Sequence, residues 1–389
     1  MEALLPVKTS QSRRVVICNF TKKQNMNKKI LTLIFSTIFT LNNFAQSPSI
    51  QKVNLSSVDY FFTIKDKISL GKSITEDDWK TLFNTNGYKI SATSSMRKKI
   101  IKEMMIAAYN PNFKLKKDSI LNISIEENLK NPYALLCNMT LSNFIDYSKN
   151  EKNLKRFRSE YDFKAIPEYS KIKLKNFLIN PVDSLIKVPT INFLCYEPDA
   201  QSKEKGIVVD FNLFYKQNPS ERIDFIAHET FHKYRRNFIN TKLIESNAVL
   251  REIDKLQDEG IADLIDKKEN LLESINNKGL PEIFVKQYYE AFQNTSDILK
   301  EFDNIVNSFL SKEISQEQME SKVNNFFLSG GHPNGYFMAR LIEKAGLKNE
   351  MINNFYSPTE FIKTYNEAAK KENGYIFSDE FIHYIESLK

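Results

Sequence analysis

The chain has 389 residues, of which 41% are hydrophobic and 26% charged. This composition is typical of a folded protein with a sizeable core and not of a disordered chain. The formal net charge is +7, but residues 1–45 carry seven Lys or Arg and one Glu, which leaves +1 for the rest. The Lys/Arg clusters beyond the leader, such as Arg97–Lys99 and Lys152–Arg158, are typical of a solvated surface, and no phosphate-binding glycine loop is present, so the sequence argues against nucleic acid as a partner.

The first segments in chain order are predicted not to belong to the mature fold. Met26 is followed by two lysines, the apolar run Ile30–Leu41 and a small residue at Ala45, which is the pattern of a signal peptide over 26–45. Residues 1–25 are then an upstream, non-native extension. The apolar run is too short to span a membrane, and no cysteine follows it closely to carry a lipid anchor. We therefore expect a secreted or periplasmic protein with no stable membrane span after signal removal.

Residues 46–185 are predicted to form a helical N-terminal region. Thr75 opens a capped helix that runs through Trp79, and Met96–Tyr109 is apolar at helical spacing. Long amphipathic stretches follow near 118–148 and 150–178, with Pro132 interrupting the first of them.

Two cysteines, Cys137 and Cys195, remain after the leader. They can pair in an oxidising compartment, but both lie in apolar contexts that favour buried free thiols. A cysteine nucleophile is poorly supported.

Residues 186–389 are predicted to form the catalytic domain, which begins with two strands. Thr190–Tyr196 and Gly206–Tyr215 are rich in β-branched and aromatic residues, and Glu197–Lys205 is a polar connection, so we expect a hairpin. An edge strand beside the following helix can hold an extended peptide by backbone hydrogen bonds. The helix itself is signalled by Asn218 as its cap, followed by Pro219 and Glu221.

This helix carries the strongest signal in the chain, the pentapeptide His228-Glu229-Thr230-Phe231-His232. Histidines four residues apart lie on one helix face, so both can bind a single Zn²⁺. Glu229 then projects toward the open metal position, where it can take a proton from water as a general base. The alternative is an ordinary amphipathic helix with histidines at its solvent boundary.

A third metal ligand is expected on the next helical stretch, where Glu259 is followed by Asp263 one turn later. Both carboxylates share a face, so Glu259 can bind zinc while Asp263 accepts the spare N–H of a ligand histidine and fixes its tautomer. Gly260 permits close approach of another helix. The rival acids are Glu245, Glu252 and Asp258.

These motifs resemble those of the gluzincins, the thermolysin-like metallopeptidases with two histidines and a glutamate. The spacing from His232 to Glu259 is longer than in thermolysin. Glu259–Asp263, Gly335–Ala339 and the stretch Trp79–Tyr88 further resemble uncharacterised bacterial families of zinc-dependent peptidases. The resemblance is dense only over residues 205–346. It implies a small sheet before the motif helix and helices after it.

The resemblance also implies a late His or Tyr that stabilises the developing oxyanion, and His332 or Tyr336 can take this role. They lie in and after a glycine-rich loop, and Asn334 is the expected cap of a helix that Gly346 closes. The remaining histidine, His383, has no partner at ligand spacing and is expected in the core or on the surface.

We expect a mostly helical α+β fold and an exported zinc-dependent metallohydrolase, most simply a peptidase. Zn²⁺ is the expected cofactor, held by His228, His232 and Glu259, and a peptide or protein is the expected substrate. A zinc amidase acting on cell-wall peptides and a non-catalytic binding protein with a retained metal site remain as alternatives. The sequence does not indicate the oligomeric state or the specificity.

Overall fold

The computed structural model describes residues 52–388, apart from 125–126, 128–129, 179–185, 268–270 and 277–281. The predicted extension and signal peptide, residues 1–45, lie outside the described residues. Gln51–Lys389 forms one compact unit. Across the described residues, the helices are too short or too polar to cross a membrane.

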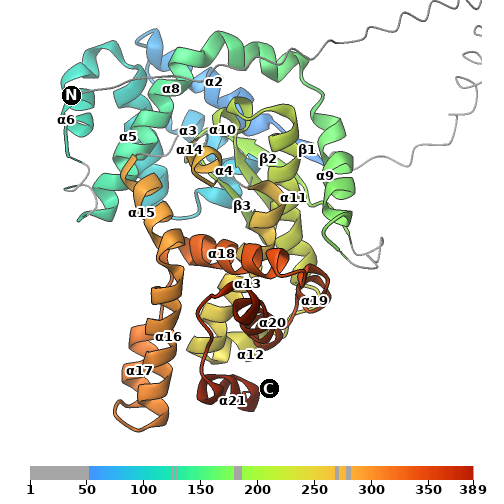
Figure 1. Ribbon diagram of the computed structural model, residues 1–389. Coiled ribbons are helices and arrows are strands. Elements are labelled where there is room, and N and C mark those ends of the chain that lie inside the picture. The colour runs from blue at the N-terminus through green and yellow to red at the C-terminus, as the bar shows by residue number, and fades with distance from the viewer. Residues whose placement is uncertain are drawn as a thin grey trace, which may run out of the picture. The chain divides into compact units, whose positions relative to one another are not determined.

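The N-terminal part of this unit is helical, as predicted (Figure 1). Its helices are α2 (Ser56–Ser69), α3 (Glu76–Asn84), α4 (Asn86–Ser91), α5 (Ser95–Tyr109), α6 (Lys114–Leu121), α8 (Pro132–Glu160) and α9 (Ile166–Lys175), with 3-10 turns at Pro111–Phe113 and Phe163–Ala165. The Thr75 capping box is confirmed. Pro132 begins α8 instead of interrupting a helix, because a proline in the first turn has no N–H to leave unpaired. α8 continues to Glu160, so the predicted boundary between two helices near residue 149 is wrong.

A four-stranded sheet has the order β1-β2-β4-β3. The strands are β1 (Val53–Asn54), β2 (Ile191–Leu194), β3 (Ala200–Lys203) and β4 (Gly206–Asp210). The predicted hairpin of the two apolar segments is wrong. β2 and β4 run parallel, with Ile191 opposite Ile207, and the hairpin partner of β4 is β3, within the stretch expected to be a connection. Every residue of β2 and β4 is buried, as in parallel strands covered on both faces, whereas the more polar β3 lies at the edge.

The second predicted strand is also shorter than expected, because Asp210 ends it. The Asp210 carboxylate accepts a hydrogen bond from the Leu213 N–H and so caps α10 (Phe211–Lys216). The chain then enters α11 (Pro219–Arg235), the motif helix.

Helices make up the rest of the described chain, which confirms the predicted mostly helical α+β fold. They are α12 (Thr241–Ser246), α13 (Ala248–Asp266), α14 (Leu271–Asn276), α15 (Glu282–Gln293), α16 (Thr295–Leu310), α17 (Gln316–Val323), α18 (His332–Lys344), α19 (Lys348–Asn353), α20 (Pro358–Glu372) and α21 (Asp379–Ser387), with a 3-10 turn at Leu328–Gly331. Ser357 caps α20, since its side chain accepts a hydrogen bond from the Glu360 N–H. Asn334 is not the cap of α18, which begins at His332. The Asn334 amide is buried instead and donates to the Ala291 carbonyl.

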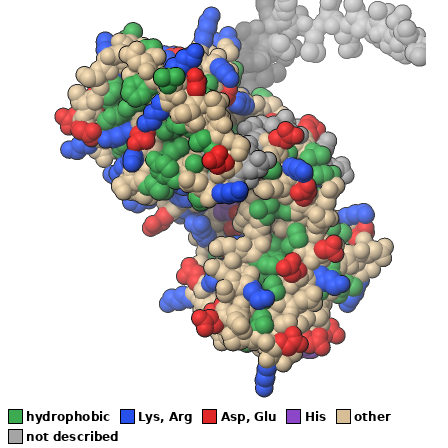
Figure 2. Space-filling model, turned by 90° about the vertical axis from the view of Figure 1, so that its left-hand side faces the viewer, with side chains coloured by type: hydrophobic (Ala, Val, Ile, Leu, Met, Phe, Trp, Pro, Cys, Tyr) green, Lys and Arg blue, Asp and Glu red, His purple; other side chains and the backbone are tan. Residues whose placement is uncertain are grey.

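Two hydrophobic clusters meet at the motif helix. The first joins the N-terminal helices to the sheet and includes Phe225 and Ile226 of α11. The second joins the C-terminal helices and includes Ala227 and Phe231 of the same helix. In Figure 2 the surface is hollowed about half-way down the molecule, at the level where α13 and α18 lie in Figure 1. The zinc motif begins at His228, directly after the point on α11 where the buried residues pass from the first cluster to the second.

Candidate metal centre

The motif helix begins where the sequence predicts. The Asn218 side chain accepts from the Glu221 N–H, and the Glu221 carboxylate accepts from the Asn218 N–H, so both ends of a capping box form. His228, Glu229 and His232 follow in the middle of α11 and are all buried. Local sequence therefore sets where α11 starts. The packing of α11 against both hydrophobic clusters shields the motif from bulk water.

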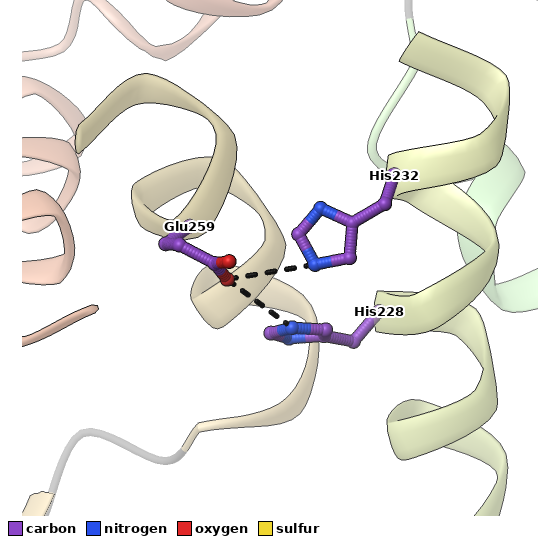
Figure 3. A group of neighbouring side chains, drawn as sticks. All are labelled: His228, His232 and Glu259. Atoms are coloured by element: carbon purple, nitrogen blue, oxygen red, sulfur yellow. Dashed lines mark ion pairs between the residues drawn. The ribbon is translucent and has the colours of Figure 1, made fainter. Parts of the chain in front are cut away.

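The two motif histidines face Glu259, which projects from α13 (Figure 3). The Nε2 atoms of His228 and His232 lie 3.6 Å and 3.5 Å from the Oε2 atom of Glu259. This oxygen is buried and has no hydrogen-bond partner among the described residues. Zinc–ligand bonds of about 2.0–2.1 Å in a tetrahedron put neighbouring ligand atoms about 3.3 Å apart. The three side chains therefore fit one zinc ion.

The other ring nitrogen of each histidine lies against an aspartate. Nδ1 of His228 is 3.0 Å from Oδ1 of Asp266, and Nδ1 of His232 is 3.0 Å from Oδ2 of Asp258. Asp258, which was a rival metal ligand in the sequence analysis, thus lies beside the predicted ligand His232. The His228 pair is a hydrogen bond, whereas the His232 pair is a close ion pair without hydrogen-bond geometry. A carboxylate beside Nδ1 favours the tautomer that leaves Nε2 free for a metal.

Asp263, expected to orient a ligand histidine, is closer to another residue. Its oxygen is 3.6 Å from Nδ1 of His228, whereas both of its oxygens are 3.1 Å from Nδ1 of His332. It also accepts a hydrogen bond from the buried Lys267 ammonium. Burial opposes ionisation of Asp263, but Lys267 and His332 outweigh it and lower the Asp263 pKa to about 2.

The structure brings His332 to the centre. Its Nε2 atom is 3.2 Å from Oε2 of Glu259. Tyr336, the other late candidate, is buried with its ring 5.9 Å from that of Phe292, and burial raises its pKa to about 12. Of the two, His332 is the residue whose ring lies against the predicted ligands.

Burial and charge act in opposite directions on the central groups. Burial raises the pKa of Glu229, and the two motif histidines only partly offset this effect, so the carboxylate is a stronger base than usual. Burial lowers the pKa of His232, but Asp258 and Glu259 outweigh it and raise that pKa to about 9. Carboxylates therefore surround these rings closely enough to favour a bound cation.

Several neighbours of the centre were not predicted from the sequence, among them Asp266, Lys267 and Tyr288. The Tyr288 hydroxyl on α15 donates to Oδ2 of Asp263 at 3.4 Å, and burial raises its pKa well above the usual value. Its position, 25 residues after Asp263 on a separate helix, gave no signal at helical spacing.

The other candidates lie elsewhere. Glu245 and His383 are exposed, and Glu252 is buried in an ion pair with Lys255. Cys137 and Cys195 are both buried free thiols.

Two histidines and a glutamate that fit zinc, with a second glutamate beside them, define a metallohydrolase type of centre. The comparisons agree in kind: residues 79–374 match the model of a family described as "Putative zinc dependent peptidase (DUF5700)", and the chain belongs to this family. No curated protein and no solved structure matches the chain.

Proposed function

We propose that this protein is an exported zinc peptidase of the gluzincin type. The observation that carries the proposal is the convergence of the two motif histidine Nε2 atoms on one buried oxygen of Glu259, which has no hydrogen-bond partner among the described residues. His228, His232 and Glu259 would hold the ion. When bound, zinc supplies a Lewis acid that polarises the scissile carbonyl and makes water a stronger acid.

Glu229 takes the proton in this proposal. It follows His228 directly on α11 and is buried, and its raised pKa suits a group that accepts a proton from water and later gives it to the leaving amine. His332 is the proposed oxyanion donor. Its Nδ1 is fixed by Asp263, which leaves the Nε2 side turned toward the centre.

The edge strand offers a place for the substrate backbone. β3 pairs with β4 along one side only and contacts α11, the helix that carries Glu229. An extended peptide can add to the free edge of β3 by main-chain hydrogen bonds, which bind without selecting side chains. Export follows from the predicted signal peptide and is part of the proposal.

Metal analysis and cleavage assays on one set of proteins test this function. The mature wild type should carry about one zinc per chain and cleave members of a peptide library. Glu229→Gln should keep the zinc and lose cleavage, because the amide cannot accept the proton. Cell-wall peptides in the same assay separate a peptidase from an amidase.

Three results would count against the proposal. Folded wild type without zinc removes the metal centre. Zinc without hydrolysis of any peptide indicates a binding protein. Full activity in Glu229→Gln removes the assigned base.

A further inference from the structure

A buried guanidinium lies behind the zinc motif. Arg235 is in the last turn of α11, three residues after His232, and is only 1% exposed. The sequence alone places it in a basic run that suits the negative end of the helix. Burying such a charge is unfavourable unless its N–H groups find partners, so the contacts of Arg235 indicate the role of this side chain.

One of those contacts leads to the metal centre. Nη1 of Arg235 lies 3.7 Å from Oδ1 of Asp258, whose other oxygen lies 3.0 Å from Nδ1 of His232. A single carboxylate thus stands between the guanidinium and a proposed zinc ligand. Oδ1 of Asp258 has no hydrogen-bond partner among the described residues, so Arg235 meets it as an ion pair and not as a hydrogen-bond donor.

The rest of the guanidinium is fixed by groups far along the chain. Nε donates to the Phe355 carbonyl at 2.7 Å, and Nη2 donates to Asp254 and, at 2.8 Å, to Oε1 of Gln257. Gln257 in turn donates to the Asn354 carbonyl at 2.8 Å. With Nε and Nη2 held, the planar fork has one orientation, which places Nη1 3.7 Å from Oδ1 of Asp258.

We propose that Arg235 is a positioning residue, which fixes Asp258 and through it the orientation of the His232 ring. The inference rests on the proposed function, since it takes His232 as a zinc ligand. A purely structural role, tying α11 to the segment before α20, would use the same carbonyl contacts but would not involve the metal.

The same helix supplies a matched control. Arg222 is also buried, and its guanidinium donates to the carbonyls of Phe214 and Tyr215 and lies over the Phe157 ring. It is ten residues before His232, among the residues of the first hydrophobic cluster. Arg222→Lys and Arg235→Lys both keep the charge and lose the fork, and only the second change faces Asp258.

The experiment measures zinc affinity by competition with a chelator, together with the visible spectrum of the cobalt-substituted protein. Arg235→Lys should weaken zinc binding about 10- to 100-fold, as loss of an outer ligand contact does, and should shift the cobalt bands. Arg222→Lys should lower stability but leave affinity within about twofold, since it touches no such contact. Asp258→Asn alone and combined with Arg235→Lys should be equally weak, because Arg235 acts through Asp258.

Unchanged zinc affinity in folded Arg235→Lys overturns the inference, and so does a double variant weaker than Asp258→Asn by the full Arg235→Lys factor. If Arg235→Lys does not fold, Gln257→Met removes one acceptor from the guanidinium without a charge change, and unchanged affinity there also overturns it. A wild type that binds no zinc would instead refute the proposed function itself.

Discussion

The close approach of α13 and α18 sets the geometry of the site, and Gly260→Ala tests it. A Cβ atom added to Gly260 would lie 2.4 Å from the Gly335 carbonyl oxygen and 2.7 Å from its carbon. Non-bonded heavy atoms sit about 3.5 Å apart at best, and both partners here are helix backbone that cannot rotate away. The helices must therefore separate by about 1 Å, which moves Glu259 on α13 away from His332 on α18.

Two opposing terms set the expected stability change. Alanine is favoured over glycine within a helix by about 1 kcal/mol. Overpacking of a close contact costs about 1–3 kcal/mol, and the upper end applies because backbone meets backbone. We expect a net loss of about 1–2 kcal/mol in the free energy of unfolding. A displacement of about 1 Å at the site should lower kcat about 100-fold.

Urea unfolding and peptide cleavage by the same preparations measure both quantities. Gly335→Ala probes the contact from the other side, since its Cβ would lie 2.3 Å from the Leu256 carbonyl oxygen. It should lower both stability and kcat, as Gly260→Ala does. The sign of the change in the free energy of unfolding shows whether overpacking or helix propensity dominates. A Gly260→Ala protein that is more stable than wild type and fully active would show that helix propensity acts alone and that the contact does not set the site.

Three further predictions concern single groups. His332→Ala should retain zinc, because the three proposed ligands remain, while kcat falls about 100- to 1000-fold; equal kcat, measured beside the metal content, would contradict its role. Burial raises the pKa of Asp210 to about 6, above about 3.9 in an unfolded chain, so the folded state holds this proton more tightly. The free energy of unfolding should thus fall by about 2 kcal/mol relative to Asp210→Asn between pH 4 and 7, and parallel pH profiles would refute this. Cys137 and Cys195 are free thiols, so the melting temperature should be the same with and without a reductant, and a drop on reduction would indicate a disulfide.

The sequence was most informative where structure depends on neighbours in the chain. The Asn218 cap, the helix it opens and the shared face of His228 and His232 all follow from contacts within four residues, and the structure contains them. The strand order was mispredicted for the opposite reason. Two apolar segments with a polar stretch between them suit a hairpin, but also suit parallel neighbours with a third strand at the edge, and only packing decides between them.

The aspartates of the site also show that the sequence predicts local geometry but not the contacts between helices. Asp263 and Asp266 follow Glu259 by four and seven residues, so they lie about 40° and about 20° from it around the helix. Periodicity places both on the correct face and cannot say which histidine each one meets. That depends on how α13 crosses α11 and α18, and the crossing puts Asp266 against His228 and Asp263 against His332. Arg235, Lys267 and Tyr288 were missed because their partners are set by the same crossings.

The exposure of the four central side chains indicates how a substrate reaches them. The side chains of His228 and His232 are 5% and 9% exposed, whereas those of Glu259 and His332 are 22% and 30% exposed. All three histidines have Nδ1 within 3.1 Å of an aspartate oxygen, and they differ in contact with solvent. A resident metal needs a closed side and a reacting carbonyl needs an open one. We therefore expect zinc to be held on the α11 side of Glu259 and the substrate carbonyl to enter on the side of His332, where a hydrogen-bond donor has to be for it to act on the oxyanion.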